Sequence, residues 1–174
     1  NKKNRKKKKI QKTIDIIKKT LKRQNTIFIC GNGGSASTSD HFQCDLLNRK
    51  ISQTKNRKIV SLNNNISLIT AIANDIGYEN IFSHQIDKIS RANDTLILFS
   101  VSGNSRNLIK AAHISKKKKL NIISFTGSDG GKLKNLSNLN INIESHDYGL
   151  VEDIHLSFVH KISDMVHGKK NVIK

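Results

Sequence analysis

Apolar residues follow a helical spacing in the first part of the chain and a strand-like run directly after it. Isoleucine and leucine recur every three or four positions from Ile10 to Leu21, which predicts an amphipathic helix. Residues 26–30 then form a short run rich in β-branched and aromatic side chains, and this run stops abruptly at Gly31. The chain is therefore expected to begin with a helix that leads into a buried strand.

The same alternation of strand and helix patterns continues along the chain. Strands are expected at 58–62, 95–99 and 121–125, and helices after Ser35 and at 67–73, 108–114 and 154–166. Strands that alternate with helices favour a parallel sheet covered on both faces. The sequence therefore predicts an α/β protein, with no repeat or linker that divides it.

Length and composition indicate a single domain. With 174 residues, the chain has enough sequence for one hydrophobic core. We expect residues 1–9 to be a basic, frayed segment and residues 10–174 to form the domain.

No stretch of eighteen apolar residues and no signal peptide is evident, so a soluble, cytoplasmic protein without a membrane partner is expected. Cys30 and Cys44 lack a paired spacing, which favours reduced thiols.

The chain is strongly basic, with a formal net charge of +18. A basic surface attracts nucleic acid, and the lysine-rich run 2–9 is the segment that would carry such binding. Neither this run nor the run 116–119 is interleaved with aromatic residues that stack on bases. The richness in Lys, Asn and Ile is also consistent with a bias in genome composition. Nucleic acid is therefore not expected as the main partner.

Two glycine- and serine-rich loops come directly after predicted strands. Residues 31–35 read GNGGS, and residues 100–105 read SVSGNS. In a parallel sheet, ligands bind where such loops lead into helices, and hydroxyls with free N–H groups at a helix start suit an anion. Neither loop matches a dinucleotide or P-loop fingerprint. Each is compatible with a simple turn or helix cap, but together they favour a small phosphate ester.

Five motifs in the chain resemble the phosphoheptose isomerase family of SIS-domain proteins. They are CGNGGSASTSDHF (30–42), ANDIGYENIFSHQI (73–86), SVSGNSRNLIKA (100–111), SFTGSDGGKL (124–133) and VEDIHLSFVH (151–160). The resemblance implies a three-layer αβα sandwich with a parallel flavodoxin-like sheet. It also implies a homotetramer with active sites at subunit interfaces, which converts sedoheptulose 7-phosphate to D-glycero-D-manno-heptose 7-phosphate for cell-envelope heptose.

The same resemblance assigns residues to the binding of a sugar phosphate. The phosphate would be bound by Ser35, Ser100, Ser102 and Ser105, next to Gly33 and Gly34 of the first loop. The sugar would be lined by Asn32, Asn74, Asp75 and Thr126.

Aldose–ketose isomerisation through an enediol needs a base at carbon and an acid at oxygen. His41 and Asp45 stand at i and i+4, so they share one face of the helix expected after Ser35. The resemblance implies Asp45 as the base, where the family commonly carries Glu, and His160 as the acid.

The resemblance also implies a zinc site formed by His41, Asp45, Glu152 and His160, with Glu152 where the family has Gln. These are suitable zinc ligands. Eight helical residues, however, separate Glu152 from His160 by about 12 Å, which is too far unless Glu152 precedes the regular helix. The sequence pattern alone does not decide whether zinc binds.

Simpler structural roles are also compatible with Asp45 and His160, and with the nearby His155. Asp45 is able to pair with Arg49 at i+4, His160 to be a core or interface residue, and His155 to be structural. The exchanges at Asp45 and Glu152 would also suit a non-catalytic SIS-domain regulatory protein that binds sugar phosphates, including the type that associates with a replication initiator. The isomerase is the preferred hypothesis.

Overall fold

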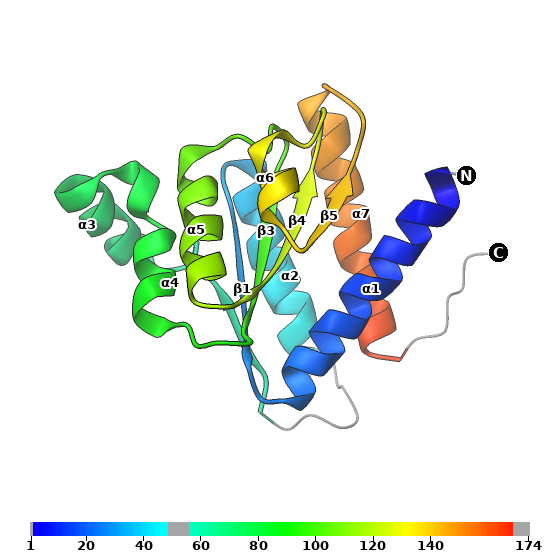
Figure 1. Ribbon diagram of the computed structural model, residues 1–174, viewed down its shortest axis with the longest axis horizontal. Coiled ribbons are helices and arrows are strands. Elements are labelled where there is room, and N and C mark those ends of the chain that lie inside the picture. The colour runs from blue at the N-terminus through cyan, green and yellow to red at the C-terminus, as the bar shows by residue number, and fades with distance from the viewer. Residues whose placement is uncertain (1, 49–55, 169–174) are drawn as a thin grey trace.

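A five-stranded parallel sheet forms the centre of the computed structural model, which describes residues 2–48 and 56–168 (Figure 1). The strand order is β2-β1-β3-β4-β5. The strands are β1 (Thr26–Gly31), β2 (Lys58–Ser61), β3 (Thr95–Ser100), β4 (Asn121–Thr126) and β5 (Leu139–Asn142). All neighbours pair in parallel, so the predicted parallel α/β architecture is confirmed.

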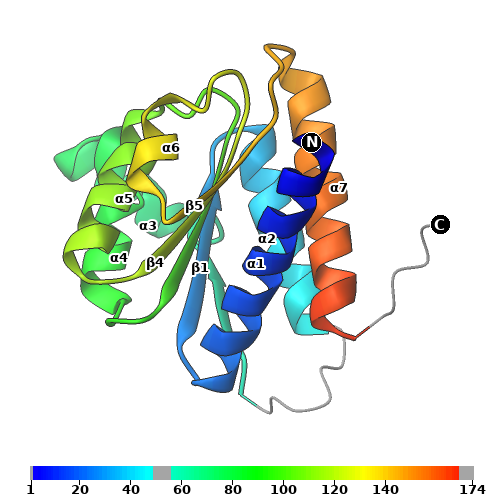
Figure 2. The same ribbon diagram turned by 45° about the vertical axis from the view of Figure 1, so that its right-hand side comes forward.

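Helices cover both faces of the sheet. The helices are α1 (Lys2–Lys22), α2 (Gly34–Asn48), α3 (Ile66–Ile76), α4 (Ser83–Ile89), α5 (Arg106–Lys117), α6 (Gly131–Leu136) and α7 (Tyr148–Val166), with a 3-10 turn η1 (Tyr78–Asn80). One core lies between the sheet and α1, α2 and α7. A second core lies between the opposite face and α4, α5 and α6 (Figure 2). The molecule is therefore the expected three-layer sandwich.

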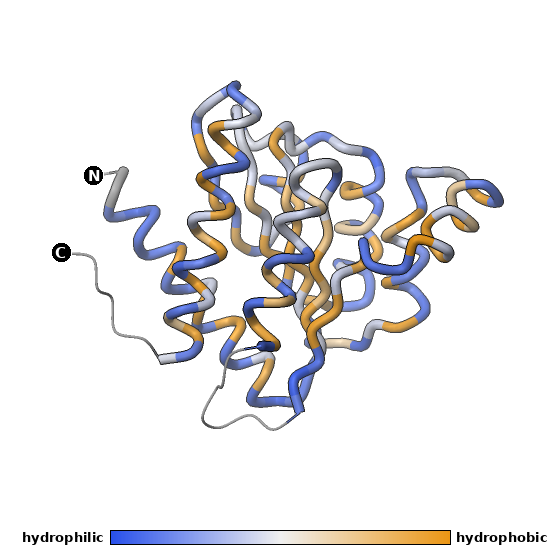
Figure 3. Tube along the Cα trace, turned by 180° about the vertical axis from the view of Figure 1, so that it is seen from behind, coloured by the Kyte–Doolittle hydropathy of each residue, from blue (hydrophilic) through white to orange (hydrophobic). Residues whose placement is uncertain are grey.

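Alternate residues of the central strands supply the two cores. Ile97 and Phe99 of β3 belong to the core under α1, α2 and α7, whereas Leu96 and Leu98 belong to the other. This alternation follows from the two-residue period of a strand. The hydropathy colouring shows the apolar segments gathered along the sheet and on the inner sides of the helices (Figure 3).

The first helix is longer than the sequence pattern suggested. Residues 2–9 were expected to be frayed, but α1 begins at Lys2 and the basic run forms its first turns. Lysine is a good helix former, and the apolar stripe that starts at Ile10 anchors the helix on the core. The Lys9 ammonium also donates to the backbone oxygen of Asn140 at 2.8 Å. Packing and propensity together outweigh the repulsion between neighbouring lysines.

Some elements were missed because they are short or lack a pattern. The sequence pattern did not identify α4, α6 or β5, which have seven, six and four residues. It also placed the start of the last helix at 154, whereas α7 begins at Tyr148, and Asp147 caps it by accepting from the Leu150 N–H at 3.0 Å. The earlier start places Glu152 inside the regular helix.

The fold brings the ends of two strands together. Gly31 of β1 lies opposite Phe99 of β3, so the loops 31–35 and 100–105 leave the sheet at the same edge. Of the helices in ranges 2–48 and 56–168, none has both the length and the apolar character needed to cross a membrane.

Candidate active site

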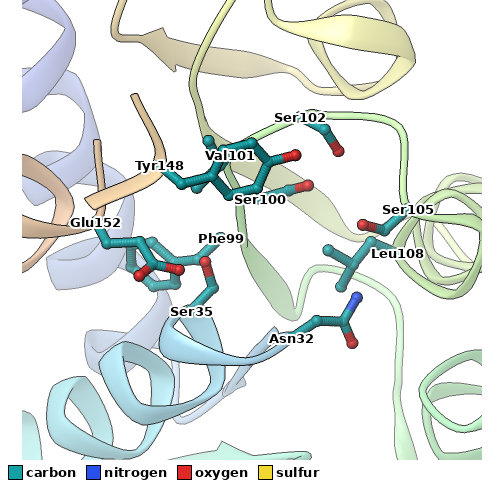
Figure 4. A pocket seen from close by; sticks show the side chains of 10 residues that line it. All are labelled: Asn32, Ser35, Phe99, Ser100, Val101, Ser102, Ser105, Leu108, Tyr148 and Glu152. Carbon is teal, nitrogen blue, oxygen red and sulfur yellow. The ribbon is translucent and has the colours of Figure 1, made fainter. Parts of the chain in front are cut away.

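A hollow of about 110 Å³ opens where β1 and β3 end, between the first turns of α2, α5 and α7 (Figure 4). It is lined by Asn32, Ser35, Phe99, Ser100, Val101, Ser102, Ser105, Leu108, Tyr148 and Glu152. The four serines that the family resemblance assigned to phosphate are thus brought together from two loops. Two helix starts, those of α2 and α5, provide the positive ends of helix dipoles beside them.

Two of these serine hydroxyls are oriented by backbone N–H groups of their own loop. Ser100 Oγ accepts from the Gly103 N–H at 3.1 Å, and Ser102 Oγ accepts from the Asn104 N–H at 3.2 Å. A hydroxyl that accepts in this way still has its proton to donate. The loop therefore presents hydroxyl donors, which are the groups that bind phosphate oxygens.

The glycine loop curls tightly into α2. Gly33 has a φ of +56°, and the Ser35 and Ala36 N–H groups turn back to the carbonyls of Asn32 and Gly33 at 3.0 and 2.9 Å. At Gly31 a Cβ would lie 2.5 Å from the Ser35 carbonyl oxygen, so only glycine allows this close approach. The glycines place Ser35 at the edge of the hollow.

Glu152 lies over the start of α2. A Cβ on Gly34 would be 2.4 Å from Glu152 Oε2, so the missing side chain of Gly34 leaves the space that this carboxylate fills. Figure 4 shows the carboxylate next to Ser35, in the wall that also contains Tyr148. Tyr148 was missed as a pocket residue because the sequence pattern placed the start of the last helix after it.

Three residues expected to line the sugar are not at this hollow. Thr126 is fully buried, and its hydroxyl donates to Asn142 Oδ1 and accepts from Asn140 Nδ2, both at 2.8 Å. Its side chain therefore links β4 to β5. Asn74 and Asp75 are exposed near the end of α3, where the Asn74 amide donates to Asp75 Oδ1 at 2.9 Å. Of the predicted sugar residues, Asn32 alone lines the hollow.

A second group of polar side chains lies on the outer side of α2 and α7. The Nε2 atoms of His41 and His160 are 2.9 Å apart, and His41 Nε2 is 3.7 Å from Asp45 Oδ2. One ligand atom from each of the three residues lies within 4.8 Å of the others, a spacing suited to a metal ion. The Asp45 side chain is largely buried, at 13% exposure, whereas that of His41 is 45% exposed.

The predicted four-residue metal set is divided between two places. Glu152 and His160 both lie in the regular part of α7, where eight residues correspond to about 12 Å. Glu152 is in the hollow, while His41, Asp45 and His160 form the cluster. The alternative partner of Asp45, Arg49, lies outside the described residues.

The hollow and the cluster are connected by a pair of parallel helices. Gly34 contacts Glu152 at the beginning of the two helices, and His41 contacts His160 further along. Six helical residues separate Ser35 from His41, which corresponds to about 9 Å. The site therefore has a hydroxyl-rich end and an imidazole–carboxylate end on the same two helices.

His155 lies on α7 with its ring facing the core. It is 1% exposed, and its ring centroid lies 5.9 Å from that of Phe99 and 6.0 Å from that of Phe125. Burial lowers the pKa of His155 to about 4. It is therefore neutral at pH 7, and its position agrees with the structural role expected from the sequence.

Known proteins match both the sequence and the fold. The SIS domain family matches residues 2–127. The phosphoheptose isomerase of Helicobacter pylori strain 26695 is 39% identical over 157 residues, which cover 90% of this chain and 82% of that protein. The chain belongs to the phosphoheptose isomerase family.

Solved structures of this family share the fold. The phosphoheptose isomerase of Neisseria gonorrhoeae aligns with a TM-score of 0.85 and 28% identity, covering 94% of this chain and 90% of that one. The enzyme from Francisella tularensis aligns with a TM-score of 0.84 and 25% identity, covering 91% and 84%. The family resemblance and the SIS fold expected from the five motifs are thus confirmed.

Proposed function

We propose that this phosphoheptose isomerase family member interconverts sedoheptulose 7-phosphate and D-glycero-D-manno-heptose 7-phosphate for cell-envelope heptose synthesis in the cytoplasm. One observation carries the proposal: a serine-rich hollow and an imidazole–carboxylate cluster lie on the same pair of helices. A seven-carbon sugar 7-phosphate has its phosphate at one end and its reacting carbons at the other. The hollow therefore matches the phosphate end of the substrate, and the cluster matches its reacting end.

The hydroxyl-rich end binds the phosphate. Ser35, Ser100, Ser102 and Ser105 surround the hollow next to the start of two helices. Hydroxyl protons and the positive ends of helix dipoles stabilise a phosphate dianion without a lysine or arginine in the wall. Glu152, also in the wall, is suited to accept hydrogen bonds from sugar hydroxyls.

Proton transfer takes place at the imidazole–carboxylate end. Asp45 removes a proton from the carbon next to the carbonyl group, and His160 donates a proton to the carbonyl oxygen, so that an enediol forms. A proton returned from Asp45 to the neighbouring carbon, with loss of a hydroxyl proton to His160, completes the exchange of aldose and ketose. His41 lies within contact distance of both residues and keeps them together.

Zinc is proposed as the metal of this cluster. Two imidazoles and a carboxylate within 4.8 Å are a donor set typical of catalytic zinc, so the residues fit the ion. His41, Asp45 and His160 would hold it with one donor atom each, so proton transfer would use the other carboxylate oxygen of Asp45 and the other ring nitrogen of His160. Bound there, zinc would act as a Lewis acid toward the substrate oxygen.

The regulatory alternative is less well supported. A protein that only senses a sugar phosphate needs the serine hollow but has no use for a base and an acid beside it. The meeting of Asp45, His41 and His160 from two helices therefore favours the enzyme.

The enzyme is also proposed to be a homotetramer with active sites at subunit interfaces. The exposed apolar side chains of α3, including Ile66 at 73% and Ile76 at 49% exposure, are compatible with a covered surface. Light scattering of the wild type and of Ile66→Asp tests this assembly. A wild-type tetramer that dissociates in Ile66→Asp supports the covered surface, whereas a monomeric wild type would overturn the tetramer.

Proton NMR in deuterated water tests the reaction itself. Wild-type protein with sedoheptulose 7-phosphate should incorporate deuterium at carbon and form the aldoheptose, with and without added zinc. Asp45→Asn should slow both by about 100- to 10,000-fold, as expected for loss of a general base. Asp153→Asn, on the same α7 helix as His160 but exposed, serves as the control. Binding without exchange in the wild type would reject the isomerase and favour the regulatory protein.

A further inference from the structure

Asn107 is a buried amide beside the hollow whose orientation is determined by the backbone. It is 2% exposed and lies in the first turn of α5. Its Oδ1 accepts from the Leu108 N–H at 2.9 Å. Early N–H groups of a helix have no partner within the helix, and an N–H is able only to donate. The oxygen of Asn107 must therefore be the atom that faces Leu108.

The orientation of Asn107 determines that of Asn32. The two amides pair reciprocally: Asn32 Nδ2 donates to Asn107 Oδ1 at 3.0 Å, and Asn107 Nδ2 donates to Asn32 Oδ1 at 2.8 Å. Because the oxygen of Asn107 is fixed, a flipped Asn32 would place two oxygens and two NH₂ groups against each other. The Leu108 N–H therefore determines, through Asn107, the orientation of the Asn32 amide as well.

Tyr78 completes the arrangement from the 3-10 turn η1. Its hydroxyl, on η1, donates to Asn32 Oδ1 at 3.0 Å. The two acceptor positions of the Asn32 oxygen are then used by Asn107 and Tyr78. One Asn32 amide proton binds Asn107, and the second has no acceptor among the described residues. In Figure 4 the Asn32 nitrogen points toward Ser105 and Leu108 of the pocket wall, and its oxygen points the other way.

We propose that Asn107 and Tyr78 are positioning residues that hold Asn32 as a hydrogen-bond donor, and not as an acceptor, toward an oxygen of the bound sugar phosphate. This inference rests on the proposed function, because it concerns how the same hollow binds its substrate. A donor in this position suits a phosphate or carbonyl oxygen and excludes contact with a cation. Neither positioning residue contacts the proton-transfer cluster, so their effect is on binding.

Two substitutions of Asn32 separate a donor from an acceptor. Asn32→Ala removes the amide, whereas Asn32→Asp keeps the shape and replaces the donor with an acceptor. We expect Asn32→Asp to raise the dissociation constant for sedoheptulose 7-phosphate, measured by calorimetry, more than Asn32→Ala does. An Asn32→Asp protein that binds as well as wild type overturns the proposal.

A double-mutant cycle tests whether Tyr78 acts through Asn32. Tyr78→Phe removes one hydroxyl from a side chain that is 56% exposed, so folding is retained. It should raise the dissociation constant about three- to tenfold, as for one hydrogen bond, with kcat unchanged. In the Asn32→Ala protein the same change should have no effect. An effect that persists without Asn32, or no effect in the wild type, overturns the role of Tyr78.

Tyr148→Phe is the matched control, since Tyr148 lines the hollow but makes no described bond to Asn32. The factor by which Tyr148→Phe changes the dissociation constant should be the same in the wild type and in the Asn32→Ala protein. Asn107→Ala should behave like Tyr78→Phe with a larger effect, in proteins whose thermal unfolding shows that they fold. The cycle measures binding and not catalysis. Wild-type protein that binds the sugar phosphate without proton exchange would therefore overturn the isomerase function but not the positioning of Asn32. Wild-type protein that does not bind the sugar phosphate overturns both.

Discussion

The Nε2 atoms of His41 and His160 lie 2.9 Å apart, although 119 positions separate the two residues in the sequence. Their rings meet edge to face, with centroids 4.9 Å apart, and Asp45 lies one helical turn beyond His41. At this distance one ring nitrogen is able to donate its proton to the other, so the two imidazoles form a hydrogen bond between the helices. This contact joins α2 to α7 and forms the proposed proton-transfer and zinc site.

Removal of His160 should weaken zinc binding. His160→Ala leaves two of the three cluster ligands, so zinc affinity measured by calorimetry should fall by at least the roughly 10- to 100-fold typical of weaker perturbations of a zinc site. His146→Ala, which changes an exposed histidine outside the cluster, should bind zinc like the wild type. Equal zinc affinity in all three proteins would show that the ion binds elsewhere.

Loss of the Ser35 hydroxyl should weaken binding of the phosphate end. Ser35→Ala should raise the dissociation constant for inorganic phosphate about three- to tenfold, because one hydrogen bond to an anion is lost. Ser37→Ala is the matched control, since Ser37 is exposed on the same helix and does not line the hollow. Calorimetric titration with inorganic phosphate measures both. Identical affinities for the two variants would place the phosphate outside the hollow.

Gly131 keeps the second serine loop in place through backbone contact. Its φ is +52°, and an added Cβ would lie 2.5 Å from the Ser102 carbonyl oxygen. Gly131→Ala should therefore lower the free energy of unfolding by about 1–3 kcal/mol and weaken substrate binding. At Gly149 the nearest atom would be 3.6 Å away, so Gly149→Ala should be close to neutral. Urea unfolding measures the stability of the two variants, and calorimetry measures their affinity for the substrate. Equal values for Gly131→Ala and Gly149→Ala would contradict a role for the backbone contact of Gly131.

Burial of His155 should make stability depend on pH in acid. Its pKa is about 4 in the folded protein and 6.5 without burial. Between these values the unfolded chain binds a proton that the folded chain does not, so stability falls as the pH falls from 6.5 to 4, by about 3 kcal/mol in total. Below pH 4 both states are protonated, and this contribution no longer changes.

Substitution of His155 should remove that contribution. Urea unfolding at pH 7 and pH 4.5 should show a smaller loss of stability for His155→Gln than for the wild type. His113→Gln, which changes an exposed histidine, should keep the wild-type pH dependence. The same acid-induced loss in His155→Gln would assign the pH dependence to other groups.

Much of the fold was predictable because it depends on local patterns. The run 95–99 was expected to be a buried strand, and β3 is buried along its whole length. The helix at 108–114 was also expected, within one turn of the observed α5. Short elements such as α6 and β5 have too few residues to show a period. Their positions depend on the neighbouring strand and helix.

The candidate site was predictable to a similar extent. Loops that follow parallel strands lie at the same edge of the sheet, so Ser35 and Ser100 were expected at one edge. That β1 pairs directly with β3 and brings them together was decided by the fold. The displacement of Thr126 from the hollow did not, because its hydroxyl is used by Asn140 and Asn142 on a strand that the sequence pattern had not indicated. Residue type and spacing do not show which partner satisfies a buried hydroxyl.

By itself the sequence determined which side chains share one element. The i, i+4 spacing of His41 and Asp45 places them on one helix face, and the glycines place Ser35 at a helix start. Only the tertiary structure decided that His160 joins this pair while Glu152, on the same helix, lies two turns away in the hollow. The reason is physical: local spacing follows from backbone geometry, whereas contacts between α2 and α7 depend on how two helices pack on one sheet.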